Sequence, residues 1–564
     1  MHAKLYNMQR IITIISLLII LFTNAFASPK YEIRAAWITT IGGLDWPTVK
    51  ATSEYGIKRQ KEELCKQLDM LKEANFNTVL FQTRLRGDVI YPSKYETFAE
   101  SLTGKTGRNP GYDPLKFAIE ECHKRGMELH AWIVCIPAGN DRQVRLLGSK
   151  SVVKKKPAMC IHFKNAWFLD PGNPETATYL AAMAKEITSN YDIDGIHLDY
   201  IRYPENGENF PDGKMYSKYG KGKNRAQWRR DNITSIVRKI HNEVKSIKPW
   251  IKVSSAPVGK YNDTRRYSSK GWNAYNAVYQ DARLWMEKGI HDAIFPMMYF
   301  RDNQFYPFAL DWEESKHGRW VVPGLGVYFL KYRVQEWDIN EIIRQINFTR
   351  RNRLDGQAFF RNEFLMKNTC GLTDSLKCRF YAYPAAVPPM VWQDSIAPSQ
   401  PKNGTISFAS DSVKINWEKA DSSITEEVTY RIYASDFYPV DTNDGKNIIC
   451  LKHNSCSFCH STKDGSIKRF WAVTATDRYG NESSPLTLNR PSNDKRMICV
   501  NKLPETPEGC TISVNDITGM ELFRTKCNPD ELIKKLSKGV YSIQYVHPNG
   551  KLENITLIIS ETEQ

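Results

Sequence analysis

The chain has 564 residues, of which 41% are hydrophobic and 25% are charged, and its formal net charge is +16. This is the composition of an ordinary globular protein, which excludes a disordered or fibrous chain and leaves room for several domains. Aromatic residues amount to 12%, and their rings serve both protein cores and the clefts that bind sugars.

The N-terminus has the pattern of an export signal. Lys4 and Arg10 precede an apolar run from Ile11 to Phe22, and Ala25-Phe26-Ala27 supplies small residues for cleavage. The run is too short to cross a membrane, so residues 1–27 are predicted to be a signal peptide. We therefore expect an exported protein, periplasmic or at the cell surface, without a transmembrane anchor. A basic exported protein meets anionic glycans more often than nucleic acid, so the predicted partner is a polysaccharide and not a nucleic acid.

Between about residues 30 and 390 the sequence alternates between strand and helix patterns. The eight expected strands begin at Ile33, Asn77, Met127, Ile193, Ile251, Ala293, Trp320 and Gly356. Eight such units predict an α/β fold, a closed (β/α)8 TIM barrel. The alternative is a doubly wound open sheet, which normally carries a glycine-rich phosphate loop after its first strand. The segment 39–43, Thr-Thr-Ile-Gly-Gly, does not have that pattern.

Two smaller all-β modules are expected after a proline-rich linker at 388–402. Residues 396–490 contain short alternating strands and resemble a fibronectin type III sandwich. Residues 497–564 resemble the C-terminal sorting domain of type IX secretion substrates through NDITGMEL and LSKGVYSI. That resemblance implies the type IX secretion machinery as a partner, and an ordinary adhesion-like β module is the alternative.

Asp199 is the leading candidate for catalysis. A (β/α) barrel carries its active site at the carboxyl ends of its strands, and Asp199 ends the fourth predicted strand in the motif DGIHLDY. A buried carboxylate there is costly unless it is paired or functional. The structural alternative is an ion pair between Asp199 and either Arg202 or Arg86.

Glycoside hydrolysis needs two carboxyl groups that flank the scissile bond. Glu363, which we expect at the end of the eighth strand, and Asp88, on the loop after the second strand, are the candidates for the partner of Asp199. Because a neighbouring Arg86 lowers the pKa of Asp88, Glu363 is favoured as the acid. Asp88 could instead form a salt bridge that organises its loop.

Further side chains at the predicted strand ends are expected to line the same mouth and bind substrate. Aromatic rings would stack on sugars, and arginines would bind carboxylates on a glycan. These residues are Trp37, Arg84, Arg86, His130, Trp132, His197, Arg202, Tyr203, Tyr299 and Arg361. We find no nucleotide or metal motif, so neither a cofactor nor a metal is predicted. Export permits disulfides, for which Cys370 with Cys378 and pairs among Cys450, Cys456 and Cys459 are candidates.

The motifs EIRAAWITT, FNTVLFQTRLRGDVIYPS, GYDPLKFAIEECHKRGMELHAW and DGIHLDYIRYP resemble the glycosyl hydrolase-like 10 family, in barrel order across most of residues 30–390. The resemblance implies a (β/α) barrel that hydrolyses glycosidic bonds, and it matches Asp199 to the family's fourth-strand Asp. It also suggests peptidoglycan glycan strands without peptides as a substrate. A non-catalytic glycan-binding surface protein and a lytic transglycosylase-type enzyme are the alternative functions.

Overall fold

The chain divides into two compact units, one of residues Pro29–Ser395 and one built mainly from Ile396–Gln564, and each is described by itself. The computed structural model describes residues 28–331, 334–409, 411–421, 427–462, 467–489, 497–500, 503–506, 509–516, 520–526, 528–537, 539–546 and 552–559. The predicted signal peptide lies outside the described residues. In the part of the chain that is described, no helix has both the length and the apolar composition needed to cross a membrane.

The first unit is built on parallel strands. They are β1 (Ile33–Ile38), β2 (Thr78–Arg84), β5 (Glu128–Val134), β9 (Gly195–Asp199), β10 (Lys252–Ser255), β11 (Ala293–Ile294), β12 (Trp320–Val321), β13 (Gly324–Leu325) and β14 (Gly356–Phe359). β12 and β13 are two parts of one strand, interrupted at Val322-Pro323, because β12 pairs with β11 and β13 pairs with β14. Since β14 also pairs with β1, the ring closes. The predicted TIM barrel is therefore confirmed.

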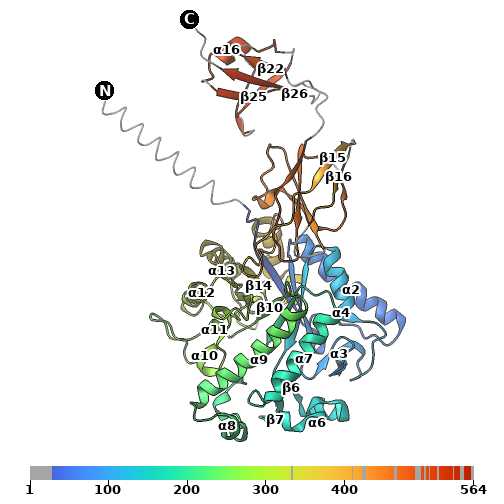
Figure 1. Ribbon diagram of the computed structural model, residues 1–564, viewed down its shortest axis with the longest axis vertical. Coiled ribbons are helices and arrows are strands. Elements are labelled where there is room, and N and C mark those ends of the chain that lie inside the picture. Colours follow the sequence, from blue (N-terminus) through green and yellow to red (C-terminus); the bar gives the residue numbers. More distant parts are fainter. Residues whose placement is uncertain are drawn as a thin grey trace. The chain divides into compact units, whose positions relative to one another are not determined.

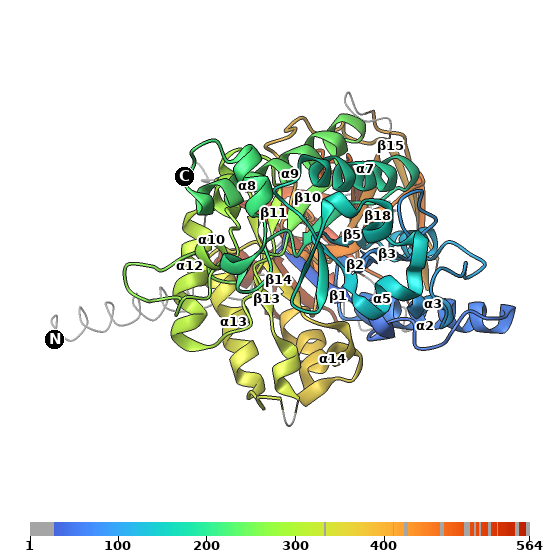
Figure 2. The same ribbon diagram turned by 90° about the horizontal axis from the view of Figure 1, so that it is seen from below.

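Helices surround this ring, as the end-on view in Figure 2 shows. They are α2 (Glu54–Glu73), α4 (Pro114–Lys124), α7 (Pro174–Asn190), α9 (Arg225–Ile247), α11 (Ala282–Glu287), α12 (Tyr306–Glu314), α13 (Ile339–Arg351) and α14 (Asn362–Met366). Polar residues begin most of them: the side chains of Ser53, Asp113, Asn173, Asn224, Asp281 and Asp338 each accept an amide N–H of the first turn. Such caps satisfy amides that have no partner inside the helix.

Insertions follow the carboxyl ends of several strands. The long one after β5 forms a small antiparallel sheet with two short helices. Its elements are β6 (Pro137–Asn140), α5 (Asp141–Leu147), α6 (Val152–Lys155), β7 (Cys160–Phe163) and β8 (Ala166–Leu169). Others are β3 (Asp88–Val89), β4 (Thr97–Phe98), α3 (Glu100–Thr103), α8 (Gly213–Tyr219) and α10 (Ala274–Ala277). β6, β7, α6 and α8 gather at one end of the barrel in Figure 1.

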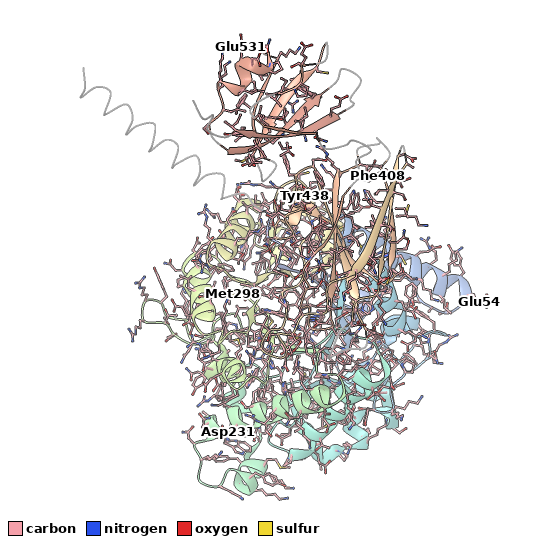
Figure 3. The ribbon with its side chains drawn as sticks, turned by 45° about the horizontal axis from the view of Figure 1, so that its top comes forward. Glu54, Asp231, Met298, Phe408, Tyr438 and Glu531 are labelled. Atoms are coloured by element: carbon pink, nitrogen blue, oxygen red, sulfur yellow. The ribbon has the colours of Figure 1, made fainter. Side chains whose placement is uncertain are left out.

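The barrel unit has one continuous apolar core that joins the strands to the helices. Met298, just after β11, is fully buried and lies among packed side chains in Figure 3, whereas Glu54 lies at the edge of the unit. The core also reaches past the last strand, because Trp392 packs on Trp320 at a ring distance of 5.0 Å and its Nε1 donates to Asp292 Oδ1 at 2.9 Å.

The contacts of Trp392 with Trp320 and Asp292, called here the seam, give a first prediction. It concerns where the chain can be truncated without loss of barrel stability. A chain that ends at Ser395 should unfold like the barrel in the full chain and keep its turnover on soluble oligosaccharide. A chain that ends at Pro389 lacks the Trp392–Asp292 hydrogen bond and should lose roughly 1.5–3 kcal/mol of stability, the value of a hydrogen bond to a charged group. Thermal unfolding of both chains checks this, and equal melting temperatures would show that the seam is unimportant.

The second unit contains two antiparallel sheets that share one core, and a third sheet with a core of its own. The first sheet holds β15 (Lys402–Phe408), β16 (Ser412–Glu418) and β19 (Ser457–Ser461). The second sheet holds β18 (Ile448–His453), β17 (Thr429–Ser435), β20 (Phe470–Thr476) and β21 (Leu486–Asn489). The third holds β22 (Met497–Val500), β26 (Leu552–Ile559), β25 (Gly539–Val546), β23 (Thr511–Asn515) and β24 (Glu521–Thr525), with α16 (Pro529–Ile533).

The predicted disulfide pairs do not form. Cys370, Cys378, Cys456 and Cys459 are free thiols, which excludes Cys370 with Cys378 and every pair among Cys450, Cys456 and Cys459. Cys450 and Cys456 donate weakly to Lys452 O and Tyr430 Oη, at 3.5 Å in each case. The expected bridges are therefore wrong for this structure.

Candidate functional site at the barrel mouth

Asp199 is the last residue of β9 and faces the barrel interior at its carboxyl end. Trp132 Nε1, from the neighbouring β5, donates to Asp199 Oδ2 at 3.1 Å, and the amide of Tyr200 donates to Oδ1 at 2.7 Å. Each carboxylate oxygen therefore has one neutral donor. Asp199 is nevertheless almost fully buried, at 6% exposure, and no cation among the described residues forms an ion pair with it. The structural alternative, an ion pair with Arg202 or Arg86, is not formed.

The backbone after Asp199 is held in an unfavourable conformation. Tyr200 has a φ of 46°, in the left-handed region that residues other than glycine seldom adopt. Such a residue costs on the order of 1–3 kcal/mol, and such residues cluster at functional sites. Here the turn brings the Tyr200 amide onto Asp199, so the strain serves the orientation of that carboxyl group.

The charge state of Asp199 is set mainly by burial. Burial raises its pKa to about 6, against the opposing hydrogen bonds of Tyr200 and Trp132 and the positive charges of Arg202 and Arg86. Removal from water disfavours the ionised form of a carboxyl group. Asp199 can therefore carry a proton at a pH near 6.

The positive charges of two arginines, Arg86 and Arg202, act on the carboxyl group of Asp199. Arg86, on the turn after β2, is exposed. Arg202 is 4% exposed, and its guanidinium stacks 4.5 Å from the centre of the Tyr200 ring. Arg202 Nε is buried and has no hydrogen-bond partner, and Glu205, the nearest carboxylate, is 4.0 Å away. A buried guanidinium with spare donors can bind an oxygen-rich group.

Partly exposed aromatic rings form a continuous row at the mouth. Tyr299, after β11, lies 5.6 Å from the ring of Tyr328 and 5.5 Å from that of Phe360. Tyr328 in turn contacts Phe329 at 4.0 Å. The charge of Asp199 contributes to the raised pKa of Tyr299, after burial and Tyr328, so the row begins beside the carboxyl group. Rings in this position can stack on the C–H faces of sugars.

Trp37 and His197 lie deeper than predicted. Trp37 Nε1 donates to His197 Nε2 at 3.3 Å, and His197 Nδ1 lies 3.0 Å from Ser254 Oγ. Burial holds the pKa of His197 well below its ordinary value, so the ring is neutral, with its proton on Nδ1. Both residues are at most 2% exposed and belong to the middle of the barrel core. Their predicted contact with substrate is wrong in this structure.

His130 is also misplaced by the sequence prediction. β5 continues to Val134, so His130 sits four residues below the strand end, in register with Gly195. His130 Nε2 lies 3.2 Å from Glu128 Oε2, and Glu128 in turn pairs with Lys252 at 2.8 Å. This group occupies the amino-terminal half of the barrel, away from Asp199. The prediction that both residues lie around one mouth is therefore wrong for His130.

Arg84 and Tyr203 are structural. Arg84 is fully buried, and its Nη2 pairs with Glu96 Oε1 at 2.6 Å. Its Nη1 donates to backbone carbonyl groups, including that of Cys135 at 3.0 Å. Tyr203 is fully buried between the rings of Phe210 and Tyr279. Neither side chain is accessible to a ligand, so their assignment to substrate binding is corrected here.

Glu363 and Arg361 lie beyond the eighth strand rather than in it. β14 ends at Phe359, and Glu363 lies in the first turn of α14. Its carboxylate forms ion pairs with Arg361 and Lys367, and Arg361 Nη1 also pairs with Asp45 Oδ1 at 2.6 Å. Although burial alone would raise the pKa of Glu363, its hydrogen bond with Lys367 and the charge of Arg361 lower it. This is the opposite of what a proton donor needs.

Asp88 helps to form a turn. Its Oδ1 accepts the amide of Arg86 at 3.2 Å, across Gly87, whose φ is 87°. Burial raises the pKa of Asp88 to about 6, and the charge of Glu96 acts in the same direction. Neither Asp88 nor Glu363 hydrogen-bonds to Asp199, whose carboxyl group among the described residues accepts only from Trp132 and Tyr200.

Sequence reasoning missed several residues of the mouth, including Tyr200, Tyr328, Phe329, Phe360 and Asp45. Tyr328 and Phe329 follow β13 within four residues, so the rule that places sites after strand ends could have found them. The strained φ of Tyr200 has no signal in the sequence, because it depends on the hydrogen bond to Asp199.

The closed barrel carries a buried, protonatable carboxyl group and an aromatic row at its carboxyl-terminal mouth, the end at which enzymes of this fold place their active sites. A family model described as glycosyl hydrolase-like 10 matches residues 32–329. The chain belongs to this family, in agreement with the resemblance of its motifs.

The chain is similar to curated proteins over most of its length. It is 32% identical over 483 residues to "Glycosyl hydrolase YngK" of Bacillus subtilis (strain 168), covering 81% of this chain and 93% of that protein. It is 33% identical over 380 residues to "Glycosyl hydrolase DigH" of Escherichia coli (strain K12), covering 59% and 84%. Among solved structures, an alpha-L-fucosidase isoenzyme 2 from Paenibacillus thiaminolyticus aligns with a TM-score of 0.43 and 14% identity, covering 65% of this chain and 52% of that one.

Proposed function

We propose that the protein is an exported glycoside hydrolase that cleaves a cell-wall or other polysaccharide, with Asp199 as its proton donor. The observation that carries the proposal is the buried carboxyl group of Asp199 at the mouth, with a pKa raised to about 6. A general acid works best when its pKa lies near the working pH. The family membership and the two relatives named glycosyl hydrolases support hydrolysis of glycosidic bonds.

The roles expected from the sequence are exchanged in this proposal. Glu363 was favoured as the acid and Asp199 as the base or nucleophile, but the pKa of Glu363 is lowered and that of Asp199 is raised. Two catalytic carboxyl groups stand about 5–9.5 Å apart in glycosidases, so the second group need not touch Asp199. Glu363, which is ionised, and Asp88 remain the two candidates for that role.

The mouth fits a glycan with acidic substituents. Arg86 and Arg202 are the cations that act on Asp199, and Arg202 has a buried donor without a partner. Tyr299 and Tyr328 offer rings that can stack on sugars. Peptidoglycan glycan strands without peptides carry one carboxylate per disaccharide, and we propose them as a substrate on this basis. We also propose that residues 1–27 direct export and that the C-terminal modules act in attachment or type IX secretion.

Product analysis tests this function directly. The purified full chain is incubated with peptide-free peptidoglycan glycan strands and with a panel of neutral and acidic polysaccharides, and the products are identified by mass spectrometry. Hydrolysis adds one water to each cleaved bond, whereas a lytic transglycosylase leaves an anhydro end. Asp199→Asn, Glu363→Gln and Asp88→Asn are assayed in parallel, and the second catalytic carboxyl is the one whose loss matches that of Asp199. Tight binding without any product would favour a non-catalytic glycan-binding protein.

The pH dependence of the reaction is a separate prediction. Because the proton donor must be protonated in the free enzyme, kcat/KM should fall about tenfold per pH unit above the pKa of Asp199, which is about 6. Arg202→Lys keeps the positive charge near Asp199. If the guanidinium of Arg202 also shields the carboxyl group from water, its loss should lower the pKa of Asp199 and move the alkaline fall of kcat/KM to lower pH. A profile that rises from pH 5 to 8 would assign Asp199 the role of a base instead.

A further inference from the structure

A large basic face lies beside the mouth, built from two segments that are far apart in the sequence. Residues 94–108 and 141–156 together contain nine lysine and arginine residues and three acidic residues. All nine cations are exposed, and eight of them are called here the basic face: Lys94, Lys105, Arg108, Arg142, Arg145, Lys150, Lys154 and Lys155. The ninth, Lys156, pairs with Glu175 at 3.6 Å.

Direct contacts bring the two segments together. Lys155 Nζ donates to the carbonyl of Tyr95, next to Lys94, at 3.3 Å. Lys150 Nζ reaches the turn between Lys105 and Arg108, where a side-chain carbon on Gly107 would lie only 3.8 Å from it. The helices α3 and α5, side by side in Figure 2, are joined by Arg142 and Glu100 at 3.5 Å.

The charge of this face is not neutralised within the barrel unit. Of the three acidic residues, Glu96 is buried in its pair with Arg84, Glu100 faces Arg142, and Asp141 accepts from Trp167 Nε1 at 2.9 Å. The other seven cations of the basic face form no ion pair with a carboxylate in the described ranges. Clustered charges of one sign raise the local concentration of ions of the other sign and speed their binding.

Chain connectivity links the basic face to the site of Asp199. The insertion that carries most of it leaves the barrel at Val134, the register partner of Asp199, and the amide of Cys135 donates to Asp199 O at 2.8 Å. Arg84 clamps the start of the insertion through the carbonyl of Cys135. Most of the basic face therefore belongs to an insertion that starts at the strand end beside Asp199.

We propose that the basic face binds the continuation of an acidic glycan strand whose scissile bond lies at Asp199. The inference rests on the proposed function of the mouth, and it adds that recognition extends beyond the cleaved bond and requires repeated negative charges. Short or neutral oligosaccharides then use the mouth alone, and long anionic strands bind more tightly. Leu146, which is 51% exposed beside Arg145, makes an anionic membrane the competing partner.

The test is equilibrium binding of the full chain to an end-labelled oligogalacturonate, with a maltooligosaccharide of equal length as the neutral probe. The variant Lys150→Gln, Lys154→Gln, Lys155→Gln is compared with Lys58→Gln, Lys66→Gln, Lys239→Gln, which removes three exposed lysines from α2 and α9. We expect the first variant to bind the oligogalacturonate roughly tenfold more weakly at low salt. The difference should shrink as salt screens the charges. The control variant and the neutral probe should show no change.

Two results would overturn the inference. One is equal affinity of both triple variants for the oligogalacturonate. The other is capture of the protein by phosphatidylglycerol vesicles that is lost in the Lys150, Lys154 and Lys155 variant while oligogalacturonate binding persists, which would assign the face to a membrane. Binding is measured without turnover, so equal binding by the two triple variants would leave the proposed hydrolase function intact. Full turnover in Asp199→Asn would overturn the catalytic role of Asp199 without affecting the binding result.

Discussion

Asp199→Asn should lower kcat/KM by roughly 10²–10⁴-fold, the range attributed to one general acid or base. Asparagine has the same size, and its side-chain oxygen can still accept one of the two N–H groups, from Trp132 or from Tyr200. What it cannot do is deliver a proton to the leaving oxygen. Turnover is measured on the polysaccharide that gives products with the unmodified chain, at a pH near 6.

The pKa of Asp199 also predicts whether Asp199→Asn raises or lowers the stability of the protein at a given pH. The folded pKa of Asp199 is about 6 and its ordinary value is 3.8. Folding therefore favours the protonated form, and Asp199 contributes progressively less stability as pH rises from about 4 through 6. At pH 8 Asp199→Asn should melt at the same temperature as the unmodified protein or higher, and any loss should appear at pH 4. A large loss of stability at pH 8, with turnover kept, would make Asp199 a structural residue.

Arg84→Met should destabilise the barrel by about 3–5 kcal/mol, because it leaves a buried carboxylate without its partner. Glu96 has no exposed side-chain surface, and its remaining donor is Tyr179 Oη at 3.0 Å. The same change frees the carbonyl groups that Arg84 clamps at the start of the β5 insertion. Urea unfolding of the barrel, followed by near-UV circular dichroism, measures the loss.

Arg86→Met is the matched control, since Arg86 is two residues after Arg84 in the sequence and is exposed. Its positive charge acts on Asp199. It should leave the unfolding midpoint unchanged and raise KM for an acidic glycan. The double variant Arg84→Met, Glu96→Leu should recover much of the stability, because no charge is then left buried and unpaired. If Arg84→Met instead raised KM and left stability unchanged, Arg84 would return to the substrate site.

Much of the barrel could be predicted because local patterns repeat along the chain. Strand patterns and helix caps such as Asp113-Pro114 depend on neighbours in sequence, and eight repeats allow few other closed arrangements. The strand ends were less certain. His130 was expected at the end of its strand, but β5 runs on to Val134, since hydrogen bonds to β2 and β9 fix its length.

For the site, the sequence by itself singled out Asp199 as the leading candidate, because a carboxyl group in the last position of a buried parallel strand has few structural uses. It could not distinguish Arg84 from Arg86. Both are arginines on one strand end, and only the fold buries Glu96 beneath the first and leaves the second at the surface.

The directions of the pKa shifts of the carboxyl groups were decided by the tertiary structure alone. A pKa depends on how much water is excluded and on which charges approach from other segments, and neither follows from the order of residues. Lys367 and Arg361 lower the pKa of Glu363, whereas burial raises the pKa of Asp199 to about 6 against the opposing hydrogen bond from Trp132. The basic face has the same origin, because folding places residues 94–108 against 141–156 and no local pattern joins them.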